Sequence, residues 1–296
     1  MNSTTPDTAM AETPPPYRPS RLRRLRDGNW ALNLLLIALA LLMFVPFYWM
    51  IVNSLLPREK AFALPPEWFP REITLNNYRE VFNLIPFGRL IFNSLKLTTI
   101  ITVGSVTIST LAAYAFARLS FPGRDLLFII MLSALMVPQQ VTVIPTFILI
   151  KNLGLLDTHE SIYLPGLINV FGTFLLRQFF LTIPRDLEDA AKLDGAGHLR
   201  ILVNVIVPLA APAISALAIF TALAAWNEFF WANVFLTSPD KMTLPVGLVM
   251  ISGRFGSGSP VVILAALSMI VIPLLILFSI AQRRITEGVA MTGLRG

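Results

Sequence analysis

The chain has 296 residues, of which 55% are hydrophobic and 14% charged, and its formal net charge is +6. Soluble domains carry roughly 25% charged residues, so this chain has too little polar surface to cover itself in water and is predicted to be an integral membrane protein. The absence of cysteine excludes disulfides, thiol catalysis and cysteine metal sites. The positive charge is expected to set membrane topology, and nucleic acid is not an expected partner.

Residues 1–29 ("TPPPYRPSRLRRLR" in part) are predicted to form a disordered, basic cytoplasmic tail. A transmembrane helix needs about 20 mostly apolar residues, and six runs meet or approach that length. They predict one transmembrane domain over 30–284, followed by a cytoplasmic tail over 285–296. The predicted spans lie near 31–53, 91–117, 126–149, 161–181, 203–226 and 261–281.

The orientation follows from lysine and arginine, which gather in the short segments that a cytoplasmic N-terminus places inside the cell. Both termini are therefore expected in the cytoplasm. By parity, the 182–202 segment between the fourth and fifth spans is cytoplasmic as well.

The 182–202 segment contains "EDAAKLDGAG", which is charged and rich in small residues. Carboxylates near its start favour the positive end of a helix dipole. Gly195 and Gly197 allow the positive φ that ends a helix. The pattern predicts a short helix from Arg185 to Asp194.

In this short helix, Glu188 and Lys192 are expected to form an i, i+4 ion pair. Ala190, Ala191 and Leu193 are expected to form a small, mostly apolar face. A helix of this length is unstable alone and must pack on something. The residues leave two choices open, the rest of its own domain or a separate protein.

"EDAAKLDGAG" followed by "IVPLAAP" resembles the EAA loop of binding-protein-dependent ABC importer permeases. The first motif position departs from the family, because Asp189 stands where glutamate is usual. The matching positions are Asp189, Ala190, Ala191, Asp194, Gly195, Ala196 and Pro208, with Leu202, Val205 and Val207 at apolar sites.

The resemblance extends over nearly all of the chain after the tail. It includes "AAYAFARLSFPGR" at 112–124, "MVPQQVTVIP" at 136–145, "WNEFFW" at 226–231 and the ending "TEGVAMTGLRG". These segments are similar to the smaller permease subunit of maltose-type carbohydrate importers. The implied fold is that of type I ABC importer permeases: all-α and polytopic, with six transmembrane helices and a cytoplasmic coupling helix at 185–197.

The implied function is translocation of a sugar or oligosaccharide across the bacterial plasma membrane by alternating access. No G-x-x-x-x-G-K-[ST] phosphate loop occurs, so the ATPase is expected to be a separate subunit that binds ATP and Mg. No cofactor, metal site or catalytic residue is expected on this chain. The implied partners are a second, larger permease, a dimer of ATP-binding subunits, an extracytoplasmic solute-binding protein and the lipid bilayer.

By this resemblance, contact with the ATPase is assigned to Glu188, Asp189, Ala190, Ala191, Asp194, Gly195, Ala196 and Gly197. The C-terminal tail is a second candidate contact with the ATPase, through Gly293, Arg295 and Gly296. The alternative for the tail is a frayed, solvated chain end.

Polar residues within spans are costly and often functional. The candidates for the substrate pathway are Gln139, Gln140, Asn169, Asn227 and Glu228. "PQQ" at 138–140, with Pro145, is expected to break the third span. "WNEFF" at 226–230 offers aromatic rings and a carboxylate to a sugar, although an interfacial aromatic belt or packing against the partner permease is the favoured explanation.

Other functions remain as alternatives. A glycerol-phosphate, polyol or amino-sugar importer belongs to the same class, but a phosphate would favour a basic pocket. An ATP-independent secondary transporter is disfavoured, because no internal repeat is evident. An intramembrane hydrolase is disfavoured, because no HExxH or GxSxG occurs.

Overall fold

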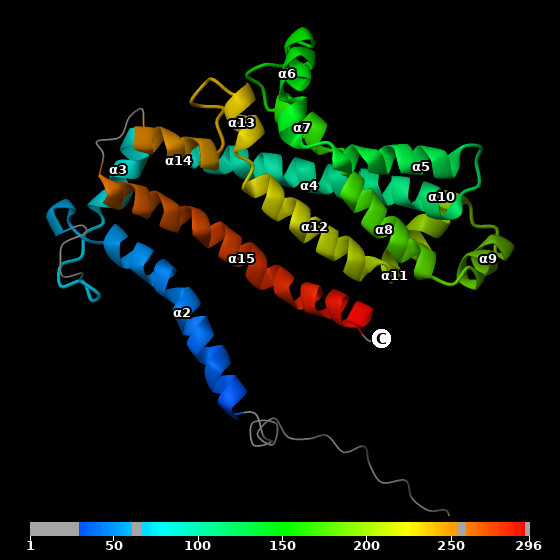
Figure 1. Cartoon of the computed structure of the whole chain (residues 1–296), viewed down its shortest axis with the longest axis horizontal. Helices are drawn as coiled ribbons and strands as arrows, with labels where there is room; N and C mark the ends of the chain where they lie inside the picture. The colour runs from blue at the N-terminus through cyan, green and yellow to red at the C-terminus, as the bar shows by residue number, and fades with distance from the viewer. Residues whose placement is uncertain (1–29, 61–66, 254–258, 294–296) are drawn as a thin grey trace, which may run out of the picture. The chain divides into compact units, whose positions relative to one another are not determined.

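The computed structural model describes residues 30–60, 67–253 and 259–293 (Figure 1). The described residues form helices and loops, with no strand among them, so the all-α class expected from the sequence is confirmed. The predicted tail over 1–29 lies outside the described residues.

The helices follow one another along the chain with short connections. In order they are α2 (Trp30–Ser54), η1 (Arg58–Lys60), α3 (Asn76–Leu84), α4 (Phe87–Arg118), α5 (Arg124–Ser133), η2 (Ala134–Met136), η3 (Gln139–Thr142), α6 (Val143–Asn152), α7 (Glu160–Gly166), α8 (Val170–Thr182), α9 (Asp186–Leu193), α10 (His198–Ile201), the π-helical turn η4 (Leu202–Ile206), α11 (Val207–Leu209), α12 (Ala211–Trp226), α13 (Phe230–Phe235), α14 (Leu244–Gly253) and α15 (Pro260–Gly293). The chain divides into two compact units after Trp49. The first unit holds most of α2, which is apolar along its length, and all other described elements belong to the second.

Four helical segments of the described residues are long and apolar enough to cross a bilayer. They are Leu32–Ser54, Phe87–Arg118, Glu160–Thr182 and Ala211–Phe235. They overlap the first, second, fourth and fifth predicted spans, and α15 overlaps the sixth. The predicted start of the fifth span at 203 lies within the helical stretch His198–Leu209, formed by α10, η4 and α11, whereas the segment long enough to cross a bilayer begins at Ala211, next to Pro212.

The third predicted span, 126–149, is not one straight helix. The segments Arg124–Met136 and Gln139–Asn152 meet at an angle of 95°. Val137 and Pro138 between them are extended, and proline has no N–H to continue the helical hydrogen bonds. The break therefore lies where "PQQ" predicts it, within the predicted third span.

Helix α4 is the central element of the second unit and packs against α8 and α12 (Figure 1). Two clusters of buried apolar side chains lie along it. The first surrounds the start of α4, here called the Phe87 end, and includes residues of α3, α13, α14 and α15. The second surrounds the Arg118 end, and includes residues of α8, α10, η4 and α12.

Asn93 connects α4 to a loop at the Phe87 end. Its side chain is buried, and its Nδ2 donates to the carbonyl oxygens of Asp240 and Met242, each at 2.9 Å. At the next residue, the Ser94 hydroxyl accepts from the Leu244 amide at 2.8 Å. These uncharged side chains satisfy loop backbone groups and fix the start of α14.

Asp157, between α6 and α7, forms a second connection at the Phe87 end. Its carboxylate accepts from the amides of Thr237 and Ser238, each at 2.9 Å, and from Lys241 Nζ at 3.1 Å. Partial burial opposes ionisation, but these hydrogen bonds, with the one from the Ser238 hydroxyl, outweigh it and hold the pKa of Asp157 well below its ordinary value. The residue also has a left-handed φ of 56°, which aspartate tolerates better than most residues.

Candidate functional site

Helix α9 lies beyond the Arg118 end of α4 and connects α8 to α10 (Figure 1). Its first turn is acidic, as a helix N-terminus favours. At its end, Gly195 has a left-handed φ of 80° and its amide donates to the Lys192 carbonyl, which turns the chain. Gly197 has a φ of −76°, so the predicted positive φ at this residue is wrong.

The exposed side of α9 is formed by Asp189, Ala190 and Leu193, and the Leu193 side chain is 90% exposed. Ala191 and Ala196 turn the other way and pack against the buried cluster at the Arg118 end. Consecutive residues of a helix are about 100° apart around its axis, so Ala190 and Ala191 cannot share one face fully. The predicted face of Ala190, Ala191 and Leu193 is therefore divided between the two sides.

Glu188 is the buried residue of α9. Its Oε1 lies 2.7 Å from Nε of Arg118, whereas Lys192 pairs with Asp189 at 2.8 Å. The predicted Glu188–Lys192 pair is wrong, because a buried guanidinium attracts the carboxylate more strongly than an exposed ammonium does. The hydrogen bond from Lys192 holds the pKa of Asp189 below its ordinary value.

The eight residues assigned to ATPase contact thus occupy one place, α9 and the turn after it, but not one surface. Asp194, Gly195 and Gly197 are exposed at the turn, whereas Glu188 faces the protein interior. Of the residues assigned to the C-terminal contact, Gly293 ends α15, and Arg295 and Gly296 lie outside the described residues.

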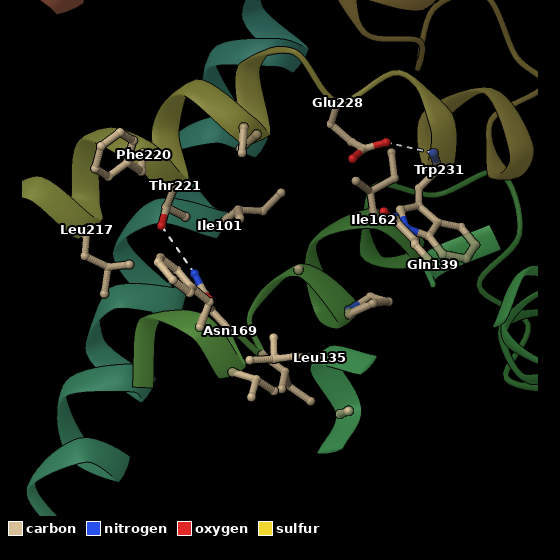
Figure 2. Close-up of a pocket in the computed structure, with 18 residues that line it drawn as sticks. Ile101, Leu135, Gln139, Ile162, Asn169, Leu217, Phe220, Thr221, Glu228 and Trp231 are labelled. Atoms are coloured by element: carbon tan, nitrogen blue, oxygen red, sulfur yellow. Dashed lines mark hydrogen bonds between the residues drawn. The ribbon is translucent and has the colours of Figure 1, made fainter. Parts of the chain in front are cut away.

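A cavity of about 660 Å³ lies where the break between η2 and η3 meets the junction of α7 and α8 and one side of α12 (Figure 2). Three predicted pathway residues line it, namely Gln139, Asn169 and Glu228. Gln140 and Asn227 are not among its lining residues. The Asn227 side chain instead donates back to the Leu223 carbonyl at 2.8 Å.

The polar residues of the cavity also hold helix ends in place. Asn169 precedes α8, and its Oδ1 accepts from the Gly172 amide at 2.7 Å, while its Nδ2 lies 3.5 Å from the Thr221 hydroxyl. Glu228 precedes α13, and its Oε1 accepts from the Trp231 amide at 2.8 Å (Figure 2). These bonds fix where the amide and the carboxylate stand in the cavity.

Most of the remaining lining is apolar or aromatic. Among the lining residues, all of which the structure describes, Glu228 is the one with a charged side chain. Thr221 and Trp231 also line the cavity, and Thr221 was not among the residues expected there. A signal existed, because Leu217, Thr221 and Ala224 recur at helical spacing on one side of α12.

Residues 105–290, more than half of the chain, match the family described as "binding-protein-dependent transport system inner membrane component". The chain belongs to this family. It is therefore a multi-pass membrane protein and the membrane component of a transport system that works with a binding protein. The family resemblance seen in the sequence is confirmed. The family is a membrane component of transport systems and not a family of enzymes.

Curated relatives agree with this assignment. The chain is 36% identical to the sulfoquinovosyl glycerol transport system permease protein SmoH of Agrobacterium fabrum, over 85% of this chain and 88% of that protein. It is 31% identical to the sn-glycerol-3-phosphate transport system permease protein UgpE of Escherichia coli, over 86% and 93%. It is 32% identical to the arabinooligosaccharides transport system permease protein AraQ of Bacillus subtilis, over 90% and 95%.

Solved structures share the fold. A chain of a bacterial ABC transporter involved in the import of the acidic polysaccharide alginate matches with a TM-score of 0.77 and 26% identity, over 90% of this chain and 99% of that chain. A chain of the bacterial alginate ABC transporter in complex with a periplasmic protein that carries alginate pentasaccharide matches with a TM-score of 0.56 and 14% identity, over 92% and 96%. The second likeness concerns the fold alone.

Proposed function

We propose that the chain is the smaller permease subunit of an ABC importer that moves a neutral sugar or oligosaccharide across the bacterial plasma membrane. The observation that carries the proposal is α9, a short helix between membrane helices with Asp189, Ala190 and Leu193 on its exposed side. Leu187 and Leu193 are 45% and 90% exposed on this one short helix, and an apolar surface formed by both suits burial by another protein. The family and the relatives of this chain are components of transport systems. An ATP-binding subunit is therefore the partner that fits the exposed side of α9.

In this arrangement, ATP and Mg bind to two separate ATPase subunits, and this chain carries no cofactor. Small side chains at Ala190 and in the following turn let a groove of the ATPase approach the helix closely. The Arg118 end and both termini then lie in the cytoplasm, as the distribution of basic residues predicts. The C-terminal tail after Gly293 is proposed as a second contact with the ATPase.

The cavity is proposed as this chain's part of the substrate pathway, completed by a second, larger permease. The Trp231 ring and the amides of Gln139 and Asn169 suit a solute rich in hydroxyl groups. The solute-binding protein would deliver it at the Phe87 end. Alternating access then opens the cavity first to that side and later to the cytoplasm.

The charge of the cavity bears on the choice of substrate. Relatives of this chain are named for transport of both neutral and anionic solutes, namely arabinooligosaccharides, sulfoquinovosyl glycerol and sn-glycerol-3-phosphate. The carboxylate of Glu228 would repel a phosphate at 4 Å by about 4 kcal/mol in surroundings of intermediate polarity. A neutral sugar is therefore favoured, and a glycerol-phosphate importer is the second candidate, in which the partner permease would have to supply cations.

The test uses the complete importer, with both permeases, the ATPase and the binding protein, in proteoliposomes. ATP-dependent uptake of an arabino-oligosaccharide, in excess over sn-glycerol 3-phosphate, is expected. Preferred uptake of glycerol 3-phosphate would contradict the neutral substrate. Uptake that persists without the ATPase would indicate a secondary transporter instead.

Contact through α9 is tested by co-purification. Ala190→Trp is expected to prevent retention of the ATPase, because the indole enlarges the exposed side of the helix. Thr182→Trp, an exposed position at the end of α8, serves as the matched control. Equal retention of the ATPase by both variants would refute docking on this side of α9.

A further inference from the structure

A buried ion pair joins α9 to the central membrane helix. Arg118 is the last residue of α4, and its Nε lies 2.7 Å from Oε1 of Glu188 in the first turn of α9. The two side chains are only 4% and 6% exposed. A buried charge is costly without its partner, so each side chain holds the other in place.

The same guanidinium also contacts the end of α8. Nη2 of Arg118 donates to the carbonyl oxygens of Phe180 and Ile183, at 2.6 and 2.7 Å. Carbonyls at a helix C-terminus have no partner within the helix and favour a cation. In the pair itself, Nε and Oε1 are close but not aligned as a hydrogen bond, so charge attraction carries the contact.

A second arginine makes the reverse connection between α8 and α4. Nε of Arg177, in α8, donates to the Phe116 carbonyl of α4 at 3.3 Å, and its guanidinium carbon lies 4.1 Å from the centre of the Phe128 ring. The ends of α4 and α8 are thus fixed to each other from both sides. A displacement that reaches Arg118 therefore acts on both helices.

The covalent connections of α9 are less suited to transmit a displacement. Residues 183–185 before it are not helical, and the turn after it passes through the left-handed Gly195. Such segments change direction by rotation about φ and ψ, whereas a buried ion pair with little free space cannot. The Glu188–Arg118 contact is thus a stiff link between α9 and the membrane helices, beside the apolar packing of Ala191 and Ala196.

We propose that Glu188 is a positioning residue through which α9 moves α4 and α8 together. The inference rests on the proposed docking of α9 on an ATPase. The exposed side of α9 contacts the ATPase, while Glu188 passes the displacement to Arg118. Both helices reach the cavity, α4 through Ile101 and α8 through Val170 and Phe171, so the displacement changes access to it.

The test follows access to the cavity and needs no knowledge of the substrate. The chain has no cysteine, so Ala224→Cys, an exposed cavity position, places a single thiol there. A membrane-impermeant maleimide then reports access in the assembled importer, with and without ATP and vanadate. The labelling rates with and without ATP and vanadate are expected to differ about tenfold in the parent, within the usual range of coupling between sites.

Glu188→Gln keeps the shape of the side chain and removes its charge. It is expected to bring the ratio to about one while the ATPase still co-purifies. Asp125→Asn makes the same kind of change at an exposed carboxylate outside α9 and is expected to behave like the parent. An unchanged ratio in Glu188→Gln would overturn the inference, whereas absence of the ATPase or of any ATP effect in the parent would contradict the proposed function instead.

Glu188→Gln could also prevent assembly of the importer. The double variant Arg118→Met, Glu188→Leu then replaces the pair with apolar side chains of similar size, which buried sites often accept. An assembled double variant without an ATP effect on labelling supports the inference. A double variant that keeps the parent's ATP effect overturns the inference, since the displacement would then pass through another contact. A double variant that also fails to assemble overturns it as well, since the pair would then serve folding alone.

Discussion

The two ends of α4 are held in different ways. At the Phe87 end, uncharged side chains such as Asn93 bind loop carbonyls, and the charged residue Asp157 stays partly exposed among backbone amides. At the Arg118 end, a fully ionic contact with Glu188 is buried among apolar side chains. Hydrogen bonds to loops fix one loop at a time, whereas the buried pair makes three helices depend on one another.

The largest effect is expected at the Arg118 end. Arg118→Leu leaves the Glu188 carboxylate buried without its partner and removes the guanidinium donor from the carbonyls of Phe180 and Ile183, and should lower the free energy of unfolding by about 3–5 kcal/mol. Thermal unfolding in detergent measures this. Arg124→Leu, at a partly exposed arginine nearby, is the control and should cost far less. Equal losses in both variants would show that the buried pair of Arg118 and Glu188 stabilises the fold no more than an exposed pair does.

A smaller effect is expected from Asn93 at the Phe87 end. Asn93→Ala removes two hydrogen bonds to the carbonyls of Asp240 and Met242 and should cost about 2 kcal/mol. Proteolysis of the 236–243 loop, followed with unfolding, should show that the loop loosens first. Asn76→Ala, at the exposed start of α3, should leave both readouts unchanged. Unaltered proteolysis in Asn93→Ala would mean that packing alone holds the loop.

Asp157 should make the Phe87 end sensitive to acid. Its pKa is lower in the folded protein than the value of about 3.9 expected when unfolded, so its contribution is complete above that value and is lost as pH falls below it. Asp157→Asn should cost about 1–2 kcal/mol at pH 7, and the gap to the parent should narrow towards pH 2. Unfolding temperatures at several pH values test this.

The control for Asp157 is Asp240→Asn, an exposed carboxylate of the neighbouring loop. It should leave the pH profile close to that of the parent. If the difference in unfolding temperature between Asp157→Asn and the parent stays constant down to pH 2, the Asp157 carboxylate is not the cause of the acid sensitivity.

The smallest effect is expected from Lys192 on the exposed side of α9. Its ion pair with Asp189 is solvated, so Lys192→Gln should not change the unfolding temperature measurably. A clear loss of stability in Lys192→Gln would show that the exposed pair of α9 stabilises the fold as the buried pair does, which contradicts the expected difference.

The sequence predicted the features that depend on local pattern. Apolar runs located most membrane helices, "PQQ" located the break after Met136, and the glycine at 195 located the end of α9. Each of these depends on residues that are near one another along the chain, where length, proline and glycine act directly.

The rest depended on contacts between distant segments. The partner of Glu188 is Arg118, far along the chain, whereas helical spacing pointed to the neighbour Lys192. Helix α14 is an apolar run of only 10 residues, too short to stand out as a span. The cavity joins Gln139, Asn169 and Glu228 from three segments, and no spacing rule distinguishes them from Gln140 or Asn227.

The 95° bend after Met136 has a consequence for water. Helix Arg124–Met136 has 13 residues, about 20 Å at 1.5 Å per residue, which is less than the roughly 30 Å hydrocarbon core of a bilayer. The extended backbone at Val137 and Pro138 would then stand at membrane depth, where free carbonyls are tolerated only beside protein or water. The cavity beside this break is thus expected to hold water before a solute enters, and the hydroxyl groups of an entering sugar would replace water bound there.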